Sequence, residues 1–134
     1  MKVVIDSNIF VMCANPLSRY YIIFQRLAEG AYTLCITTEV NFEYLEIFER
    51  KFNKSKSALL SRFLHESIFT EKTEVFFKWD LIYSDPDDNK YSDCYVAANA
   101  DYLVTNDKHF DILKQTDFPK IKVVNIDDFI KIIA

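Results

Sequence analysis

Aspartate is concentrated in one stretch of the chain, with a spacing that suits the binding of a cation. Four aspartates lie within nine residues, at Asp85, Asp87, Asp88 and Asp93, and Asp107 follows a short apolar run further on. The stretch predicts an acidic loop, a helix, a turn and a buried strand that ends just before the last acid. Ligands of open α/β sheets bind outside the carboxyl ends of the strands. The loop and the last acid could therefore meet at one edge.

Two acids from earlier in the chain are candidates for the same edge. Asp6 follows the β-rich run 2–5, and Glu43 borders the apolar stripe of a predicted helix, where a carboxylate is costly unless it is paired or bound to a cation. Mg²⁺ and Mn²⁺ prefer oxygen ligands and often keep water and substrate phosphates in their shell. Such an ion can activate water for attack on a phosphodiester. Asp6, Glu43, Asp88 and Asp107 are therefore the candidate metal-binding residues.

Each of these four side chains also has a purely structural interpretation. Asp6 could simply terminate a strand, and Glu43 could be an ordinary, partly exposed helical residue. Asp88 and Asp107 could cap the helices that follow them, a position that favours aspartate. Placement of all four at one edge is the stronger signal.

The other acids of the stretch are interpreted differently. Asp85 and Asp87 flank Pro86 and are expected to shape a turn. Asp93 lies about 140° round an ideal helix from Asp88, so its place among the same ligands stays open.

Small polar residues stand beside the candidate acids. Ser7, Asn8 and Thr105 could orient the carboxylates through hydrogen bonds, or equally bond to strand ends and helix caps. His109 is expected to be a surface residue and not a general base.

The composition predicts one folded domain over residues 1–134, because half of the residues are hydrophobic. No apolar run approaches the ~20 residues of a membrane helix, and no signal peptide is expected. The three cysteines lack metal-type spacing and suit buried thiols in a reducing cytoplasm. A net charge of −4 argues against a simple DNA-binding module but not against a metal-dependent nuclease. The single glycine disfavours a P-loop or a dinucleotide-binding fold.

Strands and helices are predicted to alternate, which favours an α/β fold with a parallel sheet. The predicted strands span residues 2–5, 32–36, 102–105 and 121–126. The predicted helices span residues 18–29, 39–52, 55–66, 89–98 and 107–113, with a last helix capped by Asp127. The register of residues 69–83 is left open, with 75–77 and 81–83 as the candidate extended segments.

Four motifs resemble those of the PIN domain family. The run 3–8, VVIDSN, is similar to the family's opening D-[ST]-N, and 39–44, EVNFEY, is similar to its E-x-x-x-E-[YF] helix. The runs 85–91, DPDDNKY, and 100–107, ADYLVTND, resemble motifs of one subgroup, the toxin components of toxin–antitoxin systems. The match is collinear from about residue 2 to residue 130. The last two motifs together are specific, whereas D-S-N alone is weak.

This resemblance implies a three-layer α/β/α domain with a central parallel sheet. It also implies a Mg²⁺- or Mn²⁺-dependent ribonuclease, in which Asp6, Glu43, Asp88 and Asp107 hold the metal and activate the attacking water. Asp93 stands where subgroup members often carry glutamate, so it would be an additional or outlying acid. Family membership further suggests an RNA substrate, a cognate antitoxin protein and a homodimer.

Two other classes of function stay open. One is a non-catalytic PIN-like module that binds RNA or protein. The other is a different aspartate-based α/β protein, but the residues fit it poorly. A haloacid-dehalogenase-like phosphatase needs a second aspartate where Asn8 stands, and a phosphoacceptor receiver needs a lysine after the last strand, where Asn125 to Asp127 stand.

Overall fold

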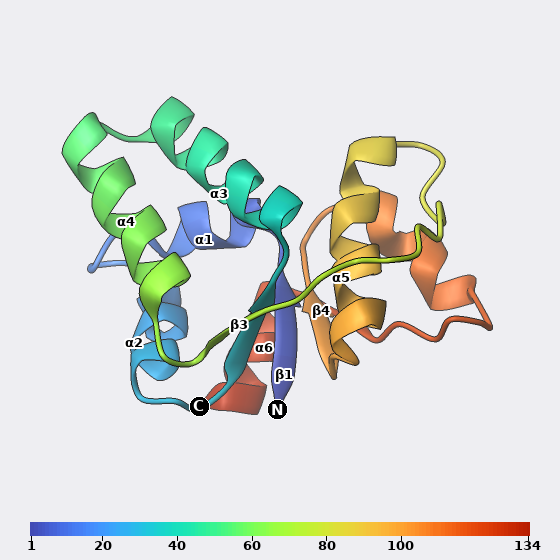
Figure 1. Cartoon of the computed structure of the whole chain (residues 1–134). Helices are drawn as coiled ribbons and strands as arrows, with labels where there is room; N and C mark the ends of the chain where they lie inside the picture. The colour runs from blue at the N-terminus through green and yellow to red at the C-terminus, as the bar shows by residue number, and fades with distance from the viewer.

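A five-stranded parallel sheet forms the centre of the molecule in the computed structural model, which describes residues 1–134 (Figure 1). Its strands are β1 (Lys2–Ile5), β2 (Thr33–Ile36), β3 (Thr70–Lys72), β4 (Tyr102–Val104) and β5 (Val123–Val124). The strand order is β3-β2-β1-β4-β5, and all four pairings are parallel. The chain thus winds outward from β1 in both directions.

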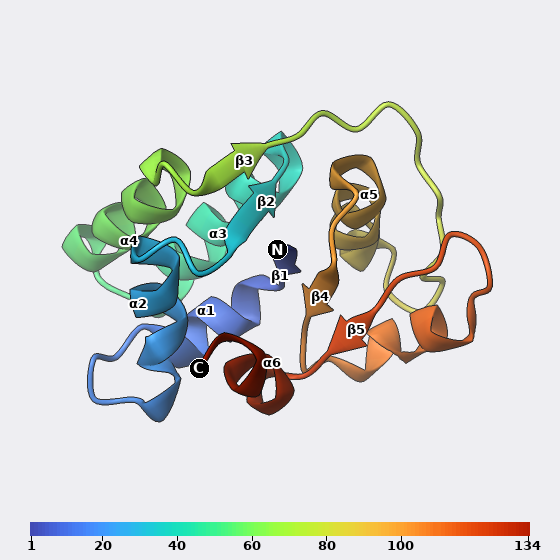
Figure 2. The same cartoon turned by 90° about the horizontal axis from the view of Figure 1, so that it is seen from below.

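Helices cover both faces of this sheet. They are α1 (Ser7–Cys13), α2 (Ile22–Ala28), α3 (Thr38–Lys51), α4 (Lys54–Glu66), α5 (Asn89–Ala98) and α6 (Ile126–Ile133), with short 3₁₀ segments η1 (Arg19–Tyr21), η2 (Pro86–Asp88) and η3 (Lys108–Gln115). Helix α5 packs on β1, β2 and β4 from one side, and α1, α2 and α6 lie on the other (Figure 2). The predicted three-layer α/β/α architecture is confirmed.

The sheet reverses its winding direction between β1 and β4. Ile5 pairs with Val104, and the ladder continues one step further because the N–H of Asp6 donates to the carbonyl of Val104 at 3.0 Å. The carboxyl ends of both strands therefore open at the same point. This topological switch point is where open α/β sheets bind ligands.

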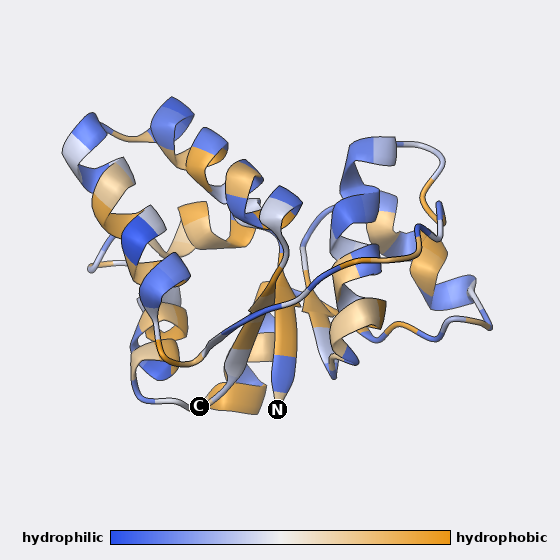
Figure 3. Cartoon of the chain, in the orientation of Figure 1, coloured by the Kyte–Doolittle hydropathy of each residue, from blue (hydrophilic) through white to orange (hydrophobic).

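Apolar side chains fix the central strands in place. Val3, Val4 and Ile5 are fully buried, as expected for a parallel strand covered on both faces (Figure 3). The hydroxyl of Tyr44 reaches from α3 into this core and donates to the carbonyl of Ile5, so the end of β1 is tied to α3. No helix is both long and apolar enough to cross a membrane.

The first half of the chain holds two elements that the sequence did not predict. Helix α1 begins at Ser7, immediately after β1, although three of its seven residues, Ile9 to Val11, are β-branched or aromatic. It forms because Asp6 caps it and because Ile9 and Phe10 bury completely. The predicted helix 18–29 is divided into η1 and α2, with Ser18 capping the 3₁₀ turn.

The register of residues 69–83 is now defined. The strand in this segment is β3, which pairs with β2, and the candidate extended segments 75–77 and 81–83 form no strand. Strand β3 was missed because it is a short polar edge strand, Thr-Glu-Lys, with no fully buried residue.

Two predictions for the C-terminal part were wrong in detail. Strand β5 is two residues long, shorter than the predicted 121–126. The cap of α6 is Asn125 and not Asp127, because the Asn125 side chain accepts from the N–H of Asp128. Helix α5 ends at Asn99, whose backbone is left-handed with φ of 54°.

Substituting the single glycine tests the turn between α2 and β2. Gly30 has φ of +78°, and a Cβ there would lie 2.7 Å from the Phe69 ring. We expect Gly30→Ala to lower the free energy of unfolding by about 1–2 kcal/mol in urea titrations, because strain and crowding add. Asn99→Gly, at the other left-handed helix end, should leave the free energy of unfolding unchanged. Equal stability of Gly30→Ala and the parent would contradict this assignment.

Candidate metal centre

Asp6 is held at the end of β1 by two hydrogen bonds. Its Oδ2 accepts from the Thr105 hydroxyl at 2.9 Å, and its Oδ1 accepts from the Asn8 N–H at 3.4 Å. The residue is only 4 % exposed. Burial raises the pKa of its carboxyl, the bonds from Thr105 and Asn8 lower it, and the charges of Glu43 and Asp107 raise it again. Asp6 is therefore a buried acceptor with a fixed direction.

Glu43 reaches the same edge from α3. Its Oε2 accepts from the hydroxyls of Ser7, at 3.2 Å, and Tyr91, and its Oε1 pairs with Lys90 Nζ at 3.1 Å. The Ser7 hydroxyl also lies 3.5 Å from Asp6 Oδ1. Tyr91 and Lys90 therefore orient a candidate ligand, a role that the sequence did not predict for them.

Asp88 differs from its predicted role as a helix cap. It ends η2 with helical backbone angles, and its side chain makes no capping hydrogen bond to α5. Its Oδ2 is buried and has no hydrogen-bond partner. A buried, unpartnered carboxylate oxygen is unfavourable by itself and calls for a cation or a proton.

The charges around Asp88 also favour a bound cation or a proton. Burial first, and then the negative charges of Asp85, Asp107, Asp6 and Glu43, raise the pKa of its carboxyl to about 7. The four predicted acids therefore lie close enough to repel one another. A bound divalent cation would remove that repulsion.

Asp107 carries out the capping role that was predicted for it and also faces the cluster. Its Oδ1 accepts from the N–H of His109 at 2.9 Å, at the start of η3. Its own N–H donates at 3.0 Å to the hydroxyl of Thr105, the group that bonds Asp6. Thr105 thus links the candidate ligands from β1 and β4.

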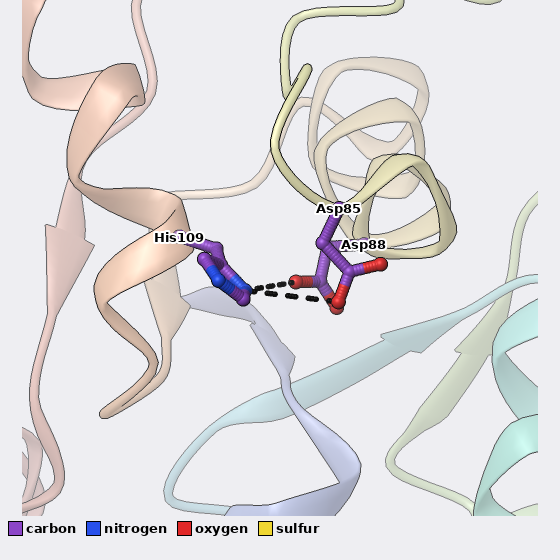
Figure 4. A group of neighbouring side chains, drawn as sticks. All are labelled: Asp85, Asp88 and His109. Atoms are coloured by element: carbon purple, nitrogen blue, oxygen red, sulfur yellow. Dashed lines mark ion pairs between the residues drawn. The ribbon is translucent and has the colours of Figure 1, made fainter.

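Asp85 and His109 join the cluster, which sequence reasoning did not foresee (Figure 4). Nδ1 of His109 lies 3.7 Å from Asp85 Oδ2, 3.8 Å from Asp88 Oδ2 and 3.3 Å from Asp107 Oδ1. Asp85, Asp88 and His109 offer ligand atoms within 4.8 Å of one another. His109 is exposed, as expected, but its ring faces the acids. The position of His109 two residues after Asp107 was the available signal.

Asp93 lies apart from the cluster. Its Oδ1 accepts from the N–H of Trp79 at 3.0 Å, and burial raises the pKa of its carboxyl. The charged groups that act on it are Asp80, Lys78 and Glu39, and none of the four candidate ligands. Among the small polar residues, Ser7 and Thr105 contact the acids through their hydroxyls, whereas Asn8 contributes its backbone N–H and exposes its side chain.

The residues present fit a hard divalent cation. The donors are carboxylate oxygens that converge from β1, α3, η2 and the end of β4, with one imidazole at the rim. Such a set suits Mg²⁺ or Mn²⁺. The buried oxygen of Asp88, which has no hydrogen-bond partner in the protein, is the observation that favours a bound cation most directly.

Comparison with known proteins agrees with this geometry. The family model described as PIN domain matches residues 2–109. The chain belongs to the PIN domain family. The match includes Asp6, Glu43, Asp88 and Asp107 and excludes α6. A search of curated protein sequences found no match.

Two solved structures share the PIN fold with this chain. One is the crystal structure of VapBC2 from Rickettsia felis bound to a DNA fragment from its promoter, with a TM-score of 0.62 at 22% identity, covering 93% of this chain and 98% of that one. The other is the PIN domain endonuclease Utp24, with a TM-score of 0.54 at 16% identity, covering 92% and 84%.

The raised pKa of Asp88 predicts a pH-dependent stability without metal. The folded protein holds this proton up to about pH 7 and the unfolded chain only to about pH 4, so the contribution of Asp88 to stability falls as pH rises between these values. In EDTA, Asp88→Asn should raise the free energy of unfolding by about 1–2 kcal/mol at pH 8, a gain reduced by solvent screening. At pH 4 the gain should vanish.

Denaturant titrations at both pH values measure this difference. Asp87→Asn, an exposed neighbour on the same turn, is the matched control and should show no pH-dependent gain. A destabilised Asp88→Asn at pH 8 would contradict the assignment.

Proposed function

We propose that the protein is a Mg²⁺- or Mn²⁺-dependent endoribonuclease that hydrolyses RNA phosphodiester bonds. Membership of the PIN domain family supports a nuclease role. The observation that carries the metal assignment is the buried Oδ2 of Asp88, which has no hydrogen-bond partner in the protein. Burial and the charges of four other carboxylates raise the pKa of the Asp88 carboxyl.

In this proposal Asp6, Glu43, Asp88 and Asp107 hold the metal. When bound, such a cation activates water and neutralises charge on the scissile phosphate. Thr105 and Ser7 keep the Asp6 and Glu43 carboxylates aimed at the site through their hydroxyl bonds.

Lys90 neutralises Glu43 through their 3.1 Å ion pair. A cation held by Glu43 would also neutralise it, and the Lys90 ammonium group would then be available to a phosphate oxygen. The ring of His109 lies at the exposed rim, where it can exchange protons with a leaving group.

We further propose that the protein is the toxin of a toxin–antitoxin pair. The motifs at 85–91 and 100–107 resemble those of the toxin subgroup, and the fold is shared with VapBC2. This assignment brings with it an antitoxin protein partner, a homodimer and a cytoplasmic location. Co-transcription with a small neighbouring gene would support it.

A non-catalytic module that binds RNA or protein is the alternative. The presence of all four acids with intact orienting partners argues against a decayed site. Calorimetry with Mn²⁺ at neutral pH separates the two possibilities, because only the nuclease requires the metal.

Removing a candidate ligand should abolish cleavage. With Mn²⁺ and a single-stranded RNA, Asp6→Asn and Asp88→Asn should each lower kcat/KM by about 100-fold or more, because losing a ligand costs at least as much as losing its orienting partner. Asp87→Asn should cleave at the parental rate. Unchanged cleavage by both purified ligand variants would refute the proposed site.

Thr105 provides a subtler test. Thr105→Val keeps the shape of the side chain but removes the hydroxyl that bonds Asp6 and accepts from the Asp107 N–H. We expect the Kd for Mn²⁺ to rise about 10- to 100-fold while the fold is retained. Affinity equal to that of the parent, measured by calorimetry, would show that this hydroxyl serves only the strand end.

A further inference from the structure

A cavity opens at the same edge of the sheet, next to the candidate metal centre. Its volume is about 310 Å³, at the lower end of the range for ligand pockets. Thr37 follows β2 and Thr73 follows β3, so the cavity lies at the carboxyl ends of these two strands. Asp6 follows β1, the next strand in the sheet. Strands about 5 Å apart place the cavity one to two strand spacings from the metal centre.

Lys90 connects the two sites. It lines the cavity, and its Nζ pairs with the candidate ligand Glu43 at 3.1 Å. An RNA strand with one phosphate at the metal centre would therefore place a neighbouring nucleotide at the cavity.

The polar lining of the cavity consists of three carboxylates, three threonines and two lysines. Asp93 is only 6 % exposed and uses Oδ1 to accept from Trp79, which leaves Oδ2 without a protein partner. Glu39 and Glu74 lie at the same wall, and the only ion pair of Glu39 is a loose 3.9 Å contact with exposed Lys78. The cavity therefore offers several strong acceptors to N–H groups.

An aromatic face completes the cavity. Phe76 lines it and is 89 % exposed, in a segment that runs from β3 across α5. Figure 3 shows a hydrophobic stretch in this otherwise polar segment. Exposed aromatic rings serve as stacking platforms for unpaired bases where positive charge nearby holds the backbone, and here Lys78 and Lys90 supply that charge.

We propose that this cavity binds an unpaired nucleobase of the RNA substrate, next to the scissile phosphate, and favours guanine over uracil. The guanine edge presents adjacent N–H donors to Asp93 and Glu39, whereas most of the uracil edge is carbonyl acceptor. Phe76 stacks on the base, and Lys78 lies where it can neutralise a flanking phosphate. This inference rests on the proposed ribonuclease function and adds a base preference to it.

Binding of short RNAs tests the proposal directly. The probes are a fluorescent octanucleotide of uridines and the same RNA with one central guanosine. Anisotropy titrations use the Asp6→Asn protein, which should not cleave them. The guanosine should tighten binding about tenfold, a typical gain for two hydrogen bonds to one base.

Three added substitutions separate stacking from hydrogen bonding. Phe76→Ala should weaken binding of both RNAs about tenfold, as expected for loss of one stacked base. Asp93→Asn, which still accepts from Trp79, and the exposed Glu39→Gln should remove the guanosine advantage. Tyr83→Ala is the matched control, because Tyr83 is an exposed aromatic on the same segment outside the cavity, and it should change neither affinity.

Cleavage assays in the otherwise wild-type protein distinguish the possible failures. If the enzyme cleaves RNA with Mn²⁺ but Phe76→Ala, Asp93→Asn and Glu39→Gln change neither affinity nor base preference, the cavity proposal is overturned and the nuclease function stands. If the folded protein neither binds nor cleaves RNA, both proposals fall, and the exposed aromatics point to a protein partner.

Discussion

The hydrogen bond from Thr105 to Asp6 is the contact on which the candidate site depends. It joins the end of β4 to the end of β1, two segments 99 residues apart in the chain. The parallel pairing of these strands makes it possible, because the Asp6 N–H extends the ladder to Val104. The same hydroxyl accepts from the Asp107 N–H, so one threonine sets the separation of two candidate ligands. Glu43 and Asp88 then need only to reach a point that the sheet has already defined.

The acids at this point repel one another, and the hydrogen-bond donors and cations of the protein offset this repulsion only in part. Lys90 and the Tyr91 hydroxyl satisfy Glu43, and backbone and hydroxyl donors satisfy Asp6. Asp88 receives no such donor, and burial with its acidic neighbours raises the pKa of its carboxyl to about 7. The carboxylates therefore differ in how fully hydrogen bonds and ion pairs satisfy them. Such a pattern is typical of functional sites, since a purely structural cluster would be expected to pair every buried group.

Much of this arrangement was predictable from the sequence, and the exceptions have physical causes. Strand β1, helix α3 and helix α5 follow from apolar runs, helical stripes and caps. Asp6 and Asp107 follow from their places after strands, Glu43 from its place beside a helical stripe, and Asp88 from the acidic loop before a helix. Helix α1 was missed because burial overrides the poor helix propensity of its residues. Strand β3 and the approach of Asp85 and His109 depend on how the segment after α4 crosses the molecule, and no local pattern encodes that path. A capping role was the alternative interpretation of Asp88 because aspartate commonly caps helices, but its side chain makes no capping hydrogen bond and its backbone is already helical.

A crystal structure of the protein grown with Mn²⁺ tests the central claim most directly, because the anomalous signal of manganese locates the ion independently of activity. We predict a peak among the carboxylates of Asp6, Glu43, Asp88 and Asp107, with Oδ2 of Asp88 as a ligand and the Glu43–Lys90 ion pair lengthened. A structure at saturating Mn²⁺ with no peak there, and with that ion pair intact, would contradict the account.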